Sequence, residues 1–403
     1  MAGTPWCFQK VKMNNKKPAI DNGNNGIETI LESLMEMGLE GFGECCAALL
    51  NLAMKMEREK ALLAKPYERT EGRLGYANGF KSKQLKTRIG ELSLQIPQVR
   101  DSSFYPKCLE KGQRSERALL LSIAEMYISG TSTRKVKHAF EELCGLEVTS
   151  MDVSRATKIL DEEFEKWRNR PIGQIRYLMI DARYEKVRIN HRVQDVAVLI
   201  AMGVDEKGHR RLLGVSVATS ESEVHWRNFL QSLQERGMTG LEMITSDDHS
   251  GLRAARRSVF PSVPWQRCQF HLMQNALSYL GKDTEEPIKE LRDIFAARND
   301  TQATERLNAL EKKYENSNPR FSHWAKENVP ECFTVYQVLE SHRRRLRTTN
   351  GLERINREIK RRTKVASIFP NTDSLLRLVT GILIEIDESW MTGRLYLETG
   401  EQH

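Results

Sequence analysis

The stretch RYLMIDA, residues 176–182, is typical of a strand that is buried on both faces and ends at the carboxylate of Asp181. Further along the chain, YEKVRI (184–189), VAVLIAMGVD (196–205) and RLLGVSVA (211–218) predict three more strands, with turn residues between them. An amphipathic helix over 222–237 then precedes the strand LEMITS (241–246), and VPWQRCQF (263–270) predicts a last strand. A meander followed by alternating helix and strand indicates an α/β sheet of mixed direction.

Carboxylates follow two of these predicted strands. Asp181 ends the first, and both Asp247 and Asp248 end LEMITS. The ends of neighbouring parallel strands can bring carboxylates together on a hard cation. A strand-end Asp is, however, more often a helix cap or a turn former. Asp248 suits that alternative because it directly precedes a helix predicted near His249, so Asp247 is the better ligand candidate.

The segment SHRRRLRTTNGLERINREIKRRTKV (341–365) is unusually basic, with ten Lys and Arg against two Glu between residues 341 and 364. Helical spacing gives it an apolar face of Leu352, Ile355 and Ile359. Glu353 lies on the other side, together with Asn350, Arg357, Lys360 and Lys364. A capping box with Asn350, or an ion pair with Arg357, would account for Glu353 without any catalysis. A single acid amid cations also suits a metal ligand with phosphate-binding neighbours.

The pattern divides the chain into six segments. Residues 1–25 are a polar lead-in, and residues 26–113 form helices with a small strand pair on either side of Ile89-Gly90. Residues 114–170 predict three short helices (114–129, 132–143 and 150–168), which suit a DNA-binding helix-turn-helix unit or, alternatively, a generic three-helix bundle. Residues 171–283 are the first part of the core, residues 284–345 are helical without a strand, and residues 346–403 complete the core with a helix over 372–390.

Composition and charge narrow the function classes. Hydrophobic residues make up 39% and charged residues 29%, which is ordinary for a globular protein. The net charge of +8 favours a polyanionic partner, chiefly nucleic acid. The seven cysteines show no CxxC spacing, so a disulfide framework is not expected, and a reducing cytosol fits. Neither a signal peptide nor a membrane-spanning stretch is predicted, which indicates a soluble cytoplasmic protein.

Several motifs together resemble the Mutator-type transposases of bacterial insertion sequences. They are IDARYEKVR (180–188), SDDHSGL (246–252), RCQFH (267–271) and TTNGLERINREIKRRTKVASIFPN (348–371), supported by segments within 67–106 and 116–136. The resemblance covers residues from about 30 to 390, and the last block is the most specific. It implies a DDE transposase with an α/β RNase H-like catalytic core, interrupted by an all-α insertion and preceded by a mainly helical N-terminal DNA-binding region.

The resemblance also assigns site residues. Asp181 is the first acid, Asp247 the second and Glu353 the third. Asp247 is chosen because the family places a glycine four residues after the second acid, and Gly251 fits. It gives Cys268 and His271 an active-site support role, together with Asn350. The Asp247-Asp248 doublet departs from the family, which more often has one Asp followed by Gly, and leaves Asp248 as a rival ligand. Cys268-x-x-His271 alone is only half a zinc site.

The function implied is cleavage of DNA at the inverted repeats of an insertion sequence, followed by joining of the freed 3′-OH to target DNA. Two Mg²⁺ ions, with Mn²⁺ as a substitute, would be held by the three acids, and two DNA ends favour a homodimer. A nuclease of the same fold that never joins strands, or a domesticated DNA-binding regulator, are the alternatives. Candidate DNA-binding residues are Arg343, Arg344, Arg345, Arg347, Arg357, Lys360, Arg361, Lys364, Trp324, Arg134, Lys135, Arg155 and Lys158. The arginine run also suits a merely solvated face, and Trp324 a core position.

Overall fold

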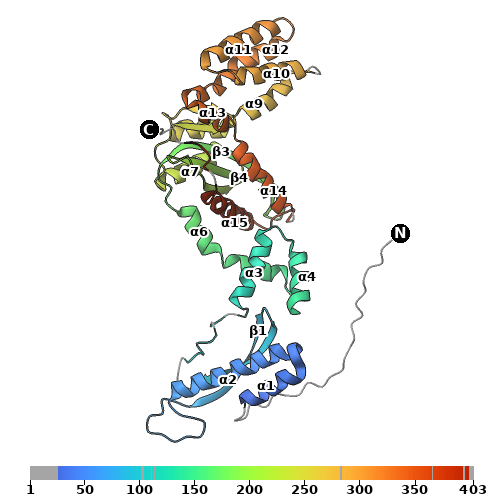
Figure 1. Ribbon diagram of the computed structural model, residues 1–403, viewed down its shortest axis with the longest axis vertical. Helices are drawn as coiled ribbons and strands as arrows, with labels where there is room; N and C mark the ends of the chain where they lie inside the picture. The colour runs from blue at the N-terminus through green and yellow to red at the C-terminus, as the bar shows by residue number, and fades with distance from the viewer. Residues whose placement is uncertain are drawn as a thin grey trace, which may run out of the picture. The chain divides into compact units, whose positions relative to one another are not determined.

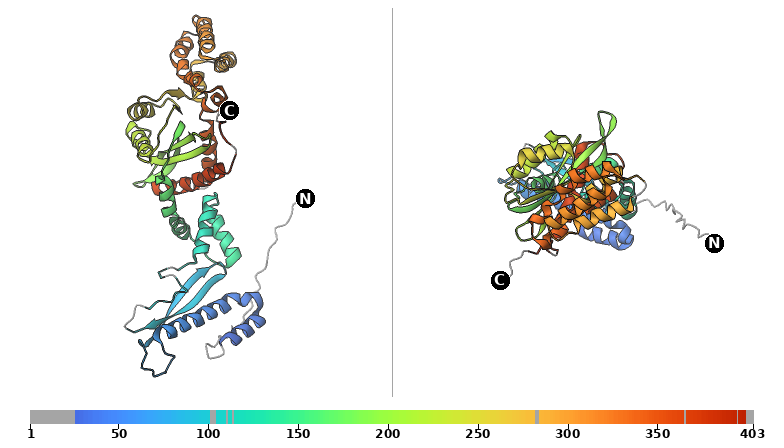
Figure 2. Two further views of the ribbon diagram at one scale, coloured as in Figure 1. Left: turned by 60° about the vertical axis from the view of Figure 1, so that its left-hand side comes forward. Right: turned by 90° about the horizontal axis from the view of Figure 1, so that it is seen from above.

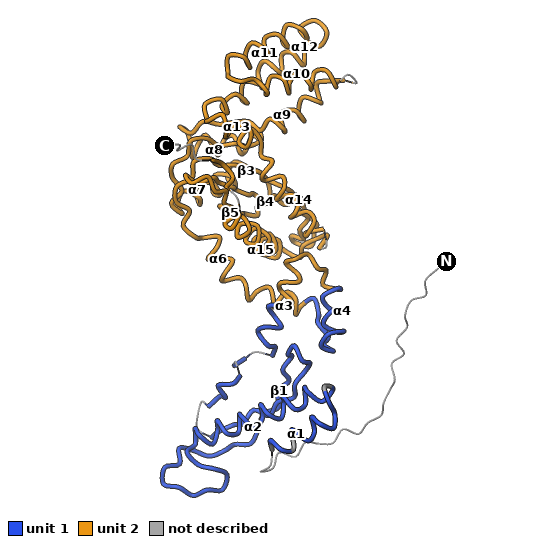
Figure 3. Tube along the Cα trace, in the orientation of Figure 1, with its two compact units in different colours: residues 1–122, 134–150 blue, residues 123–133, 151–403 orange. Residues whose placement is uncertain are grey.

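The computed structural model describes residues 26–100, 104–109, 111–112, 114–281, 284–364, 366–393 and 395–398. The predicted lead-in, residues 1–25, lies outside this range. The chain forms two compact units, coloured separately in Figure 3. Unit 1 comprises Met1–Ser122 and Arg134–Ser150, and unit 2 comprises Ile123–Thr133 and Met151–His403.

Unit 1 is built on a helix packed against a β-hairpin. It begins with α1 (Gly26–Met37), the 3-10 turn η1 (Gly38–Gly41) and α2 (Phe42–Leu62). Strands β1 (Ala77–Thr87) and β2 (Gly90–Val99) pair antiparallel with Thr87 opposite Gly90, which confirms the predicted strand pair. Leucines and isoleucine at alternate positions of β2 pack with Met54 of α2, because alternate side chains of a strand share one face.

Four helices, rather than the three predicted, lie between the hairpin and the core. They are α3 (Arg117–Ile128), α4 (Thr133–Cys144), α5 (Ser150–Lys158) and α6 (Asp161–Asn169). The single helix predicted over 150–168 is wrong, because the chain turns at Ile159 and Leu160. Asp161 then begins a new helix and forms a two-bond ion pair with Arg377, with an N–O distance of 2.6 Å.

Unit 2 contains a five-stranded sheet in the order β5-β4-β3-β6-β7. Its strands are β3 (Ile175–Ile189), β4 (Arg192–Asp205), β5 (Arg210–Ala218), β6 (Met243–Ser246) and β7 (Trp265–Arg267). The first three form an antiparallel meander, whereas β6 runs parallel to β3 and β7 parallel to β6. The sheet is therefore mixed, as predicted.

The two strands predicted over 176–182 and 184–189 are one continuous strand, β3. No turn separates them, because residues 177 to 189 each pair with a residue of β4, and Arg183 forms an in-strand ion pair with Glu185 at 2.7 Å. Asp181 consequently lies in the middle of the central strand rather than at its end. The predicted strand 263–270 is shorter than expected, since β7 ends at Arg267.

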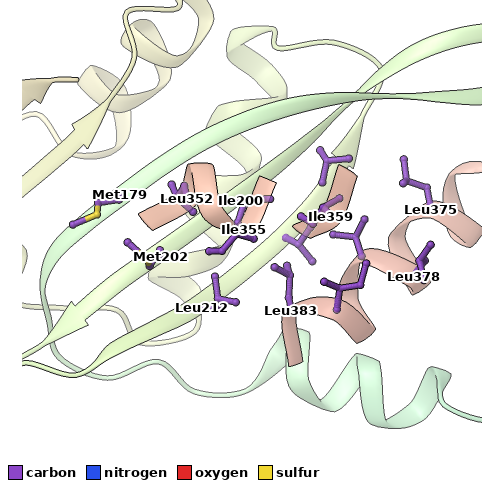
Figure 4. Packing of buried hydrophobic residues seen from close by; sticks show 14 of the residues in the cluster. Met179, Ile200, Met202, Leu212, Leu352, Ile355, Ile359, Leu375, Leu378 and Leu383 are labelled. Atoms are coloured by element: carbon purple, nitrogen blue, oxygen red, sulfur yellow. The ribbon is translucent and has the colours of Figure 1, made fainter. Parts of the chain in front are cut away.

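Helices cover both faces of the sheet (Figures 1 and 2), which explains why the first half of β3 and the second half of β4 are almost continuously buried. On one face, α7 (Glu223–Glu235) and α8 (Ser250–Val259) bury Trp226, Leu230 and Leu252. On the other, α14 (Asn350–Thr363) and α15 (Thr372–Met391) pack against the sheet. The predicted apolar face of α14 is confirmed, because its leucine and isoleucines point into this core (Figure 4).

Helices alone connect the last strand to α14 within the described residues, as predicted for 284–345. They are α9 (Gln269–Ala276), η2 (Leu277–Tyr279), α10 (Glu285–Phe295), α11 (Asp300–Tyr314), α12 (Pro319–Asn328), η3 (Val329–Cys332), η4 (Thr334–Gln337) and α13 (Glu340–Leu346). This segment has its own core, which includes Leu291, Leu307 and Phe321. None of the described helices is long and apolar enough to cross a membrane.

Candidate active site

The strand register brings the first two predicted acids together. Met179 of β3 lies opposite Thr245 of β6, so two residues further along each strand Asp181 is level with Asp247. Neighbouring strands are about 4.8 Å apart, and side chains two positions apart share a face. Tyr177 and Met179 point into the core beneath α14. Asp181 therefore points to the same side of the sheet, toward α14.

Asp181 is the most strongly perturbed acid of this site. Its side chain is buried, and burial raises the pKa of Asp181 to about 7. The positive charge of His271 opposes this rise, and the negative charge of Asp247 adds to it. A buried carboxylate beside a second carboxylate is costly to ionise, so this pair calls for a positively charged partner.

The third predicted acid, Glu353, belongs to α14, the helix that covers this face of the sheet. It lies on the first turn of α14, and Asn356, one turn further along the same face, donates a hydrogen bond from Nδ2 to Asp181 Oδ2 at 2.8 Å. Glu353 Oε1 and Asn356 Oδ1 are buried and have no hydrogen-bond partner among the described residues. The arrangement leaves acceptor oxygens available beside Asp181.

The two alternatives for Glu353 are not realised in the described structure. The helix begins at Asn350, and the residue before it, Thr349, makes no side-chain capping bond. The Thr349 hydroxyl instead lies 3.4 Å from Cys268 Sγ. The ion pairs among the described residues do not include one between Glu353 and Arg357. Asn350 itself is exposed at the start of α14, and the hydrogen bonds among the described residues do not join it to Asp181 or Asp247.

Cys268 joins the three segments that carry the candidate site. Its backbone nitrogen donates to the carbonyl of Ser246, next to Asp247, at 2.7 Å, and its Sγ accepts from the Thr349 nitrogen at 3.4 Å. His271 follows on the first turn of α9. Contact with Cys268, together with the charges of Asp181 and Asp247, raises the pKa of His271 to about 9. The cysteine is thus a support, and the histidine lies within electrostatic reach of both acids.

Glu221 is a further acid of this site that the sequence did not reveal. It lies just before α7, its side chain is only 11% exposed, and it stands 3.9 Å from His249. Burial raises the pKa of Glu221, the charge of His249 opposes the rise, and that of Asp247 reinforces it. In the sequence, Glu221 stands in a polar stretch before a helix, where an acid is ordinary. No local signal marks it.

Gly251 explains how the loop after β6 reaches Glu221. A Cβ at this position would collide with the carbonyl oxygen of Glu221 and stand 2.9 Å from the nitrogen of Glu223. Only glycine lets the start of α8 pack this closely against the chain before α7. The glycine that the sequence placed four residues after Asp247 therefore holds the Asp247 loop in position.

Asp248, the rival second acid, points into a different cluster. It pairs with Arg253 and, at 3.1 Å, with Arg267, which also pairs with Glu331 at 2.7 Å. It is not the cap of α8 either, because that helix begins at Ser250 with His249 as its N-cap. Asp248 is occupied by guanidinium groups, whereas Asp247 is the neighbour of Asp181.

Comparison with known proteins decides the family. The sequence model described as "Transposase, Mutator family" matches residues 28–393, which is most of the chain. The chain belongs to the Mutator family of transposases. The resemblance to this family is therefore confirmed, and the matched range includes Asp181, Asp247 and Glu353.

The transposase is similar to proteins of several bacterial insertion sequences. It is 52% identical over 377 residues to the transposase of element IS406 from Burkholderia multivorans, covering 93% of this chain and 97% of that one. It is 41% identical to the ISRM5 transposase of Rhizobium meliloti, covering 89% and 90% of the two chains. With the IS256 transposase in Tn4001 of Staphylococcus aureus, the identity is 37%, and the coverage is 87% and 91%.

The predicted DNA-binding residues of the transposase occupy different environments. Arg344, Arg345, Arg357, Lys360 and Lys364 are exposed near the acids in sequence, on α13 and α14. Arg347 is half-buried, Arg361 is exposed but pairs with Glu358 at 2.7 Å, and exposed positions on α4 and α5 hold Arg134, Lys135, Arg155 and Lys158. Arg343 donates to the carbonyls of Val338, Tyr336 and Arg298, so it serves to anchor the chain.

Trp324 lies in the core of the helical segment of the transposase. The side chain is only 6% exposed, and its ring stacks with Tyr279 at 5.2 Å and with Phe321 at 6.0 Å between centroids. It also lines a polar cavity of about 600 Å³ that Asp248 and Arg267 share. The neighbouring rings favour the core alternative over stacking on a DNA base.

The donor chemistry of the acids suits a hard divalent cation. Carboxylate oxygens are the ligands that Mg²⁺ prefers, Glu353 Oε1 is buried without a partner, and burial beside Asp247 disfavours an uncompensated charge on Asp181. Within the described residues, however, no three His, Cys, Asp or Glu side chains lie close enough to hold a metal ion. The structure brings Asp181 level with Asp247, and Glu353 lies one helical turn before Asn356, the residue of α14 that contacts Asp181.

Substitution of the two adjacent aspartates should separate chemistry from stability. Asp247→Asn is expected to lower transposition frequency at least about a hundredfold without a change in Tm, because the residue neighbours Asp181. Asp248→Asn is expected to lower the unfolding free energy by about 1 kcal/mol, because Arg267 keeps Glu331 as its partner. A transposition assay and thermal unfolding measure the two effects. The reverse pattern would make Asp248 the second ligand.

Proposed function

We propose that this transposase binds the terminal inverted repeats of its insertion sequence, hydrolyses DNA to free a 3′-OH, and joins that end to target DNA. The observation that carries the proposal is that Asp181 and Asp247 lie level on neighbouring strands, and that α14, the helix that bears Glu353, contacts Asp181 through Asn356. The sheet order also supports an RNase H-like core, in which an antiparallel meander continues into two parallel strands. Because two double-stranded DNA ends must be brought together, the simplest assembly is a homodimer. It would act in the cytoplasm, at the nucleoid.

Some residues of the candidate site would bind the cations, and others position those residues. Asp181, Asp247 and Glu353 would hold two Mg²⁺ ions, which when bound supply charge stabilisation for both the attacking and the leaving oxygen. Asn356 orients Asp181 through its hydrogen bond, and Cys268 fixes the Asp247 loop relative to the start of α14. His271 offers a cationic N–H group next to the acids, suited to a DNA phosphate.

Cleavage and joining can share this one site. Water attacks first and leaves a 3′-OH, and that 3′-OH is the nucleophile of the second transfer. Neither step needs a covalent link between protein and DNA, so no serine or tyrosine nucleophile is required. The exposed cations of α13 and α14 would hold the phosphates of the strand on either side of the reacting bond.

The purified protein tests this proposal with a labelled duplex that carries the end of its own element. We expect cleavage in Mg²⁺ or Mn²⁺, and joining of a supplied 3′-OH end to plasmid DNA. A chelator should abolish both reactions, because the three carboxylates need their cations. Cleavage without joined product would identify a nuclease, and DNA binding without either reaction would identify a regulator. Full activity in the chelator would contradict the metal-dependent mechanism.

A further inference from the structure

Two arginines from separate elements lie against the ring of Tyr396, and the charge of a third, Arg354, also reaches that tyrosine. Arg210 begins β5, Arg345 lies on α13 and Arg354 on α14. The guanidinium carbons of Arg345 and Arg210 lie 5.2 Å and 5.5 Å from the centre of the Tyr396 ring. Arg210 also lies 4.1 Å from the ring of Trp390. We call Arg210, Arg345, Arg354 and Tyr396 the arginine cluster.

The tyrosine is fixed where these elements meet. Its hydroxyl donates to the carbonyl of Arg345 at 3.3 Å, and its backbone nitrogen donates to the carbonyl of Gly208 in the turn before β5 at 2.9 Å. Leu397, which follows, is buried and donates to the same carbonyl. These bonds fix the position of the Tyr396 ring, against which the guanidinium groups of Arg210 and Arg345 lie.

The arginine cluster has an excess of positive charge. None of the ion pairs between described residues includes Arg210, Arg345 or Arg354, whereas Arg361 and Arg362 of α14 each pair with Glu358. Burial lowers the pKa of Arg210, and the charges of Arg354 and Arg345 lower it further. Three like charges that act on one another, without a carboxylate in any ion pair of the described residues, are unfavourable unless an anion joins them.

The geometry points to a binding site for the phosphodiester backbone of double-stranded DNA at the arginine cluster. Stacking on an aromatic face holds a guanidinium by its plane and leaves the N–H groups of its edge free, and these match phosphate oxygens two at a time. Arg345 and Arg354 are exposed, as such contacts require. Because phosphates are the same in every sequence, this site adds affinity without reading bases.

The arginine cluster lies next in sequence to the candidate site, because Arg354 follows Glu353. Its role in the reaction therefore rests on the proposed function. Arg354 directly follows Glu353, and helical geometry turns consecutive side chains by about 100° around the axis. Arg354 thus leaves α14 in a different direction from Glu353, and its charge reaches Tyr396 and Arg210. A duplex held at the cluster lies beside the candidate site, which suits target DNA, because target DNA must be accepted with little regard to its sequence.

The test is the salt dependence of binding to a short mixed-sequence duplex, with the full-length protein in a chelator so that no cleavage occurs. The logarithm of affinity falls linearly with the logarithm of salt concentration, and loss of one phosphate contact reduces this slope by about one. We expect the double variant Arg345→Ala/Arg354→Ala to reduce the slope by about two. Both side chains are exposed, so the variant should keep the Tm of the parent protein.

Arg192→Ala is the matched control. Arg192 begins β4, is exposed, and lies at the opposite end of that strand from the turn that precedes Arg210. Its removal should leave the slope unchanged. An unchanged slope in the double variant, or an equal reduction in the control, would overturn the inference. Strand joining by the parent protein is measured separately, so failure of the cluster and failure of the proposed function give different results.

Discussion

Asp181→Asn is expected to abolish DNA cleavage and joining while leaving DNA binding intact. The change keeps the shape of the side chain and removes the charge that two cations would share. The rate should fall by about three orders of magnitude, which corresponds to roughly 4 kcal/mol of transition-state stabilisation. Rates of cleavage of an end-labelled duplex, measured in excess Mg²⁺, check this expectation.

The same substitution should not weaken the fold. Burial already raises the pKa of Asp181 to about 7, so a neutral amide is easily accommodated there. Asp195→Asn is the control, because Asp195 is an exposed residue on the paired strand β4 and stands 3.6 Å from Lys186. Its cleavage rate should match that of the parent protein. If Asp181→Asn cleaved DNA at the parental rate, the assignment of the first acid would be wrong.

Gly251→Ala adds a single methyl group and is expected to lower both the stability and the activity of the protein. The new Cβ would collide with the Glu221 carbonyl and force α8 away from the chain before α7. Such overpacking costs about 3 kcal/mol, or roughly 6–12 °C in Tm for a unit of this size. Activity should also fall, because the Asp247 loop moves with the start of α8. Thermal unfolding and a transposition assay measure the two effects.

Gly281→Ala supplies the comparison. A Cβ at Gly281 meets no atom within 4 Å, so this variant should keep both the parental Tm and the parental activity. The contrast tests the close approach at Gly251 rather than a general effect of losing a glycine. Equal behaviour of the two variants would show that α8 can move without consequence for the acids.

Local pattern predicted much of the fold, and the family resemblance selected the three acids, whose role stays a prediction. Apolar runs located the strands, because a sheet covered on both faces has an unmistakable composition. The spacing of Leu352, Ile355 and Ile359 correctly predicted which side of α14 is buried. Glu353 is not part of that buried face, which agrees with the helical spacing.

The remaining features depend on contacts between segments that are distant in sequence. Arg183 looked like part of a turn because it is polar, but it binds the Asn356 carbonyl at 2.5 Å across the sheet–helix interface. The role of Asn356 as the hydrogen-bond partner of Asp181 needs a pairing 175 residues apart. Glu221 reaches the site only because Gly251 permits it. The periodicity of apolar residues within one segment does not predict contacts between segments that are distant in sequence.

The contact between Cys268 and Thr349 also determines how freely the intervening chain can vary in length. These residues lie 3.4 Å apart at Sγ and Oγ1, so the helices between them form a closed loop with a core of its own. The entropy of closing a loop grows only slowly, by about 0.6 kcal/mol for each doubling of its length. Shortening, extending or exchanging α10–α12 should therefore cost the sheet little, which makes this loop a natural place to graft a foreign domain.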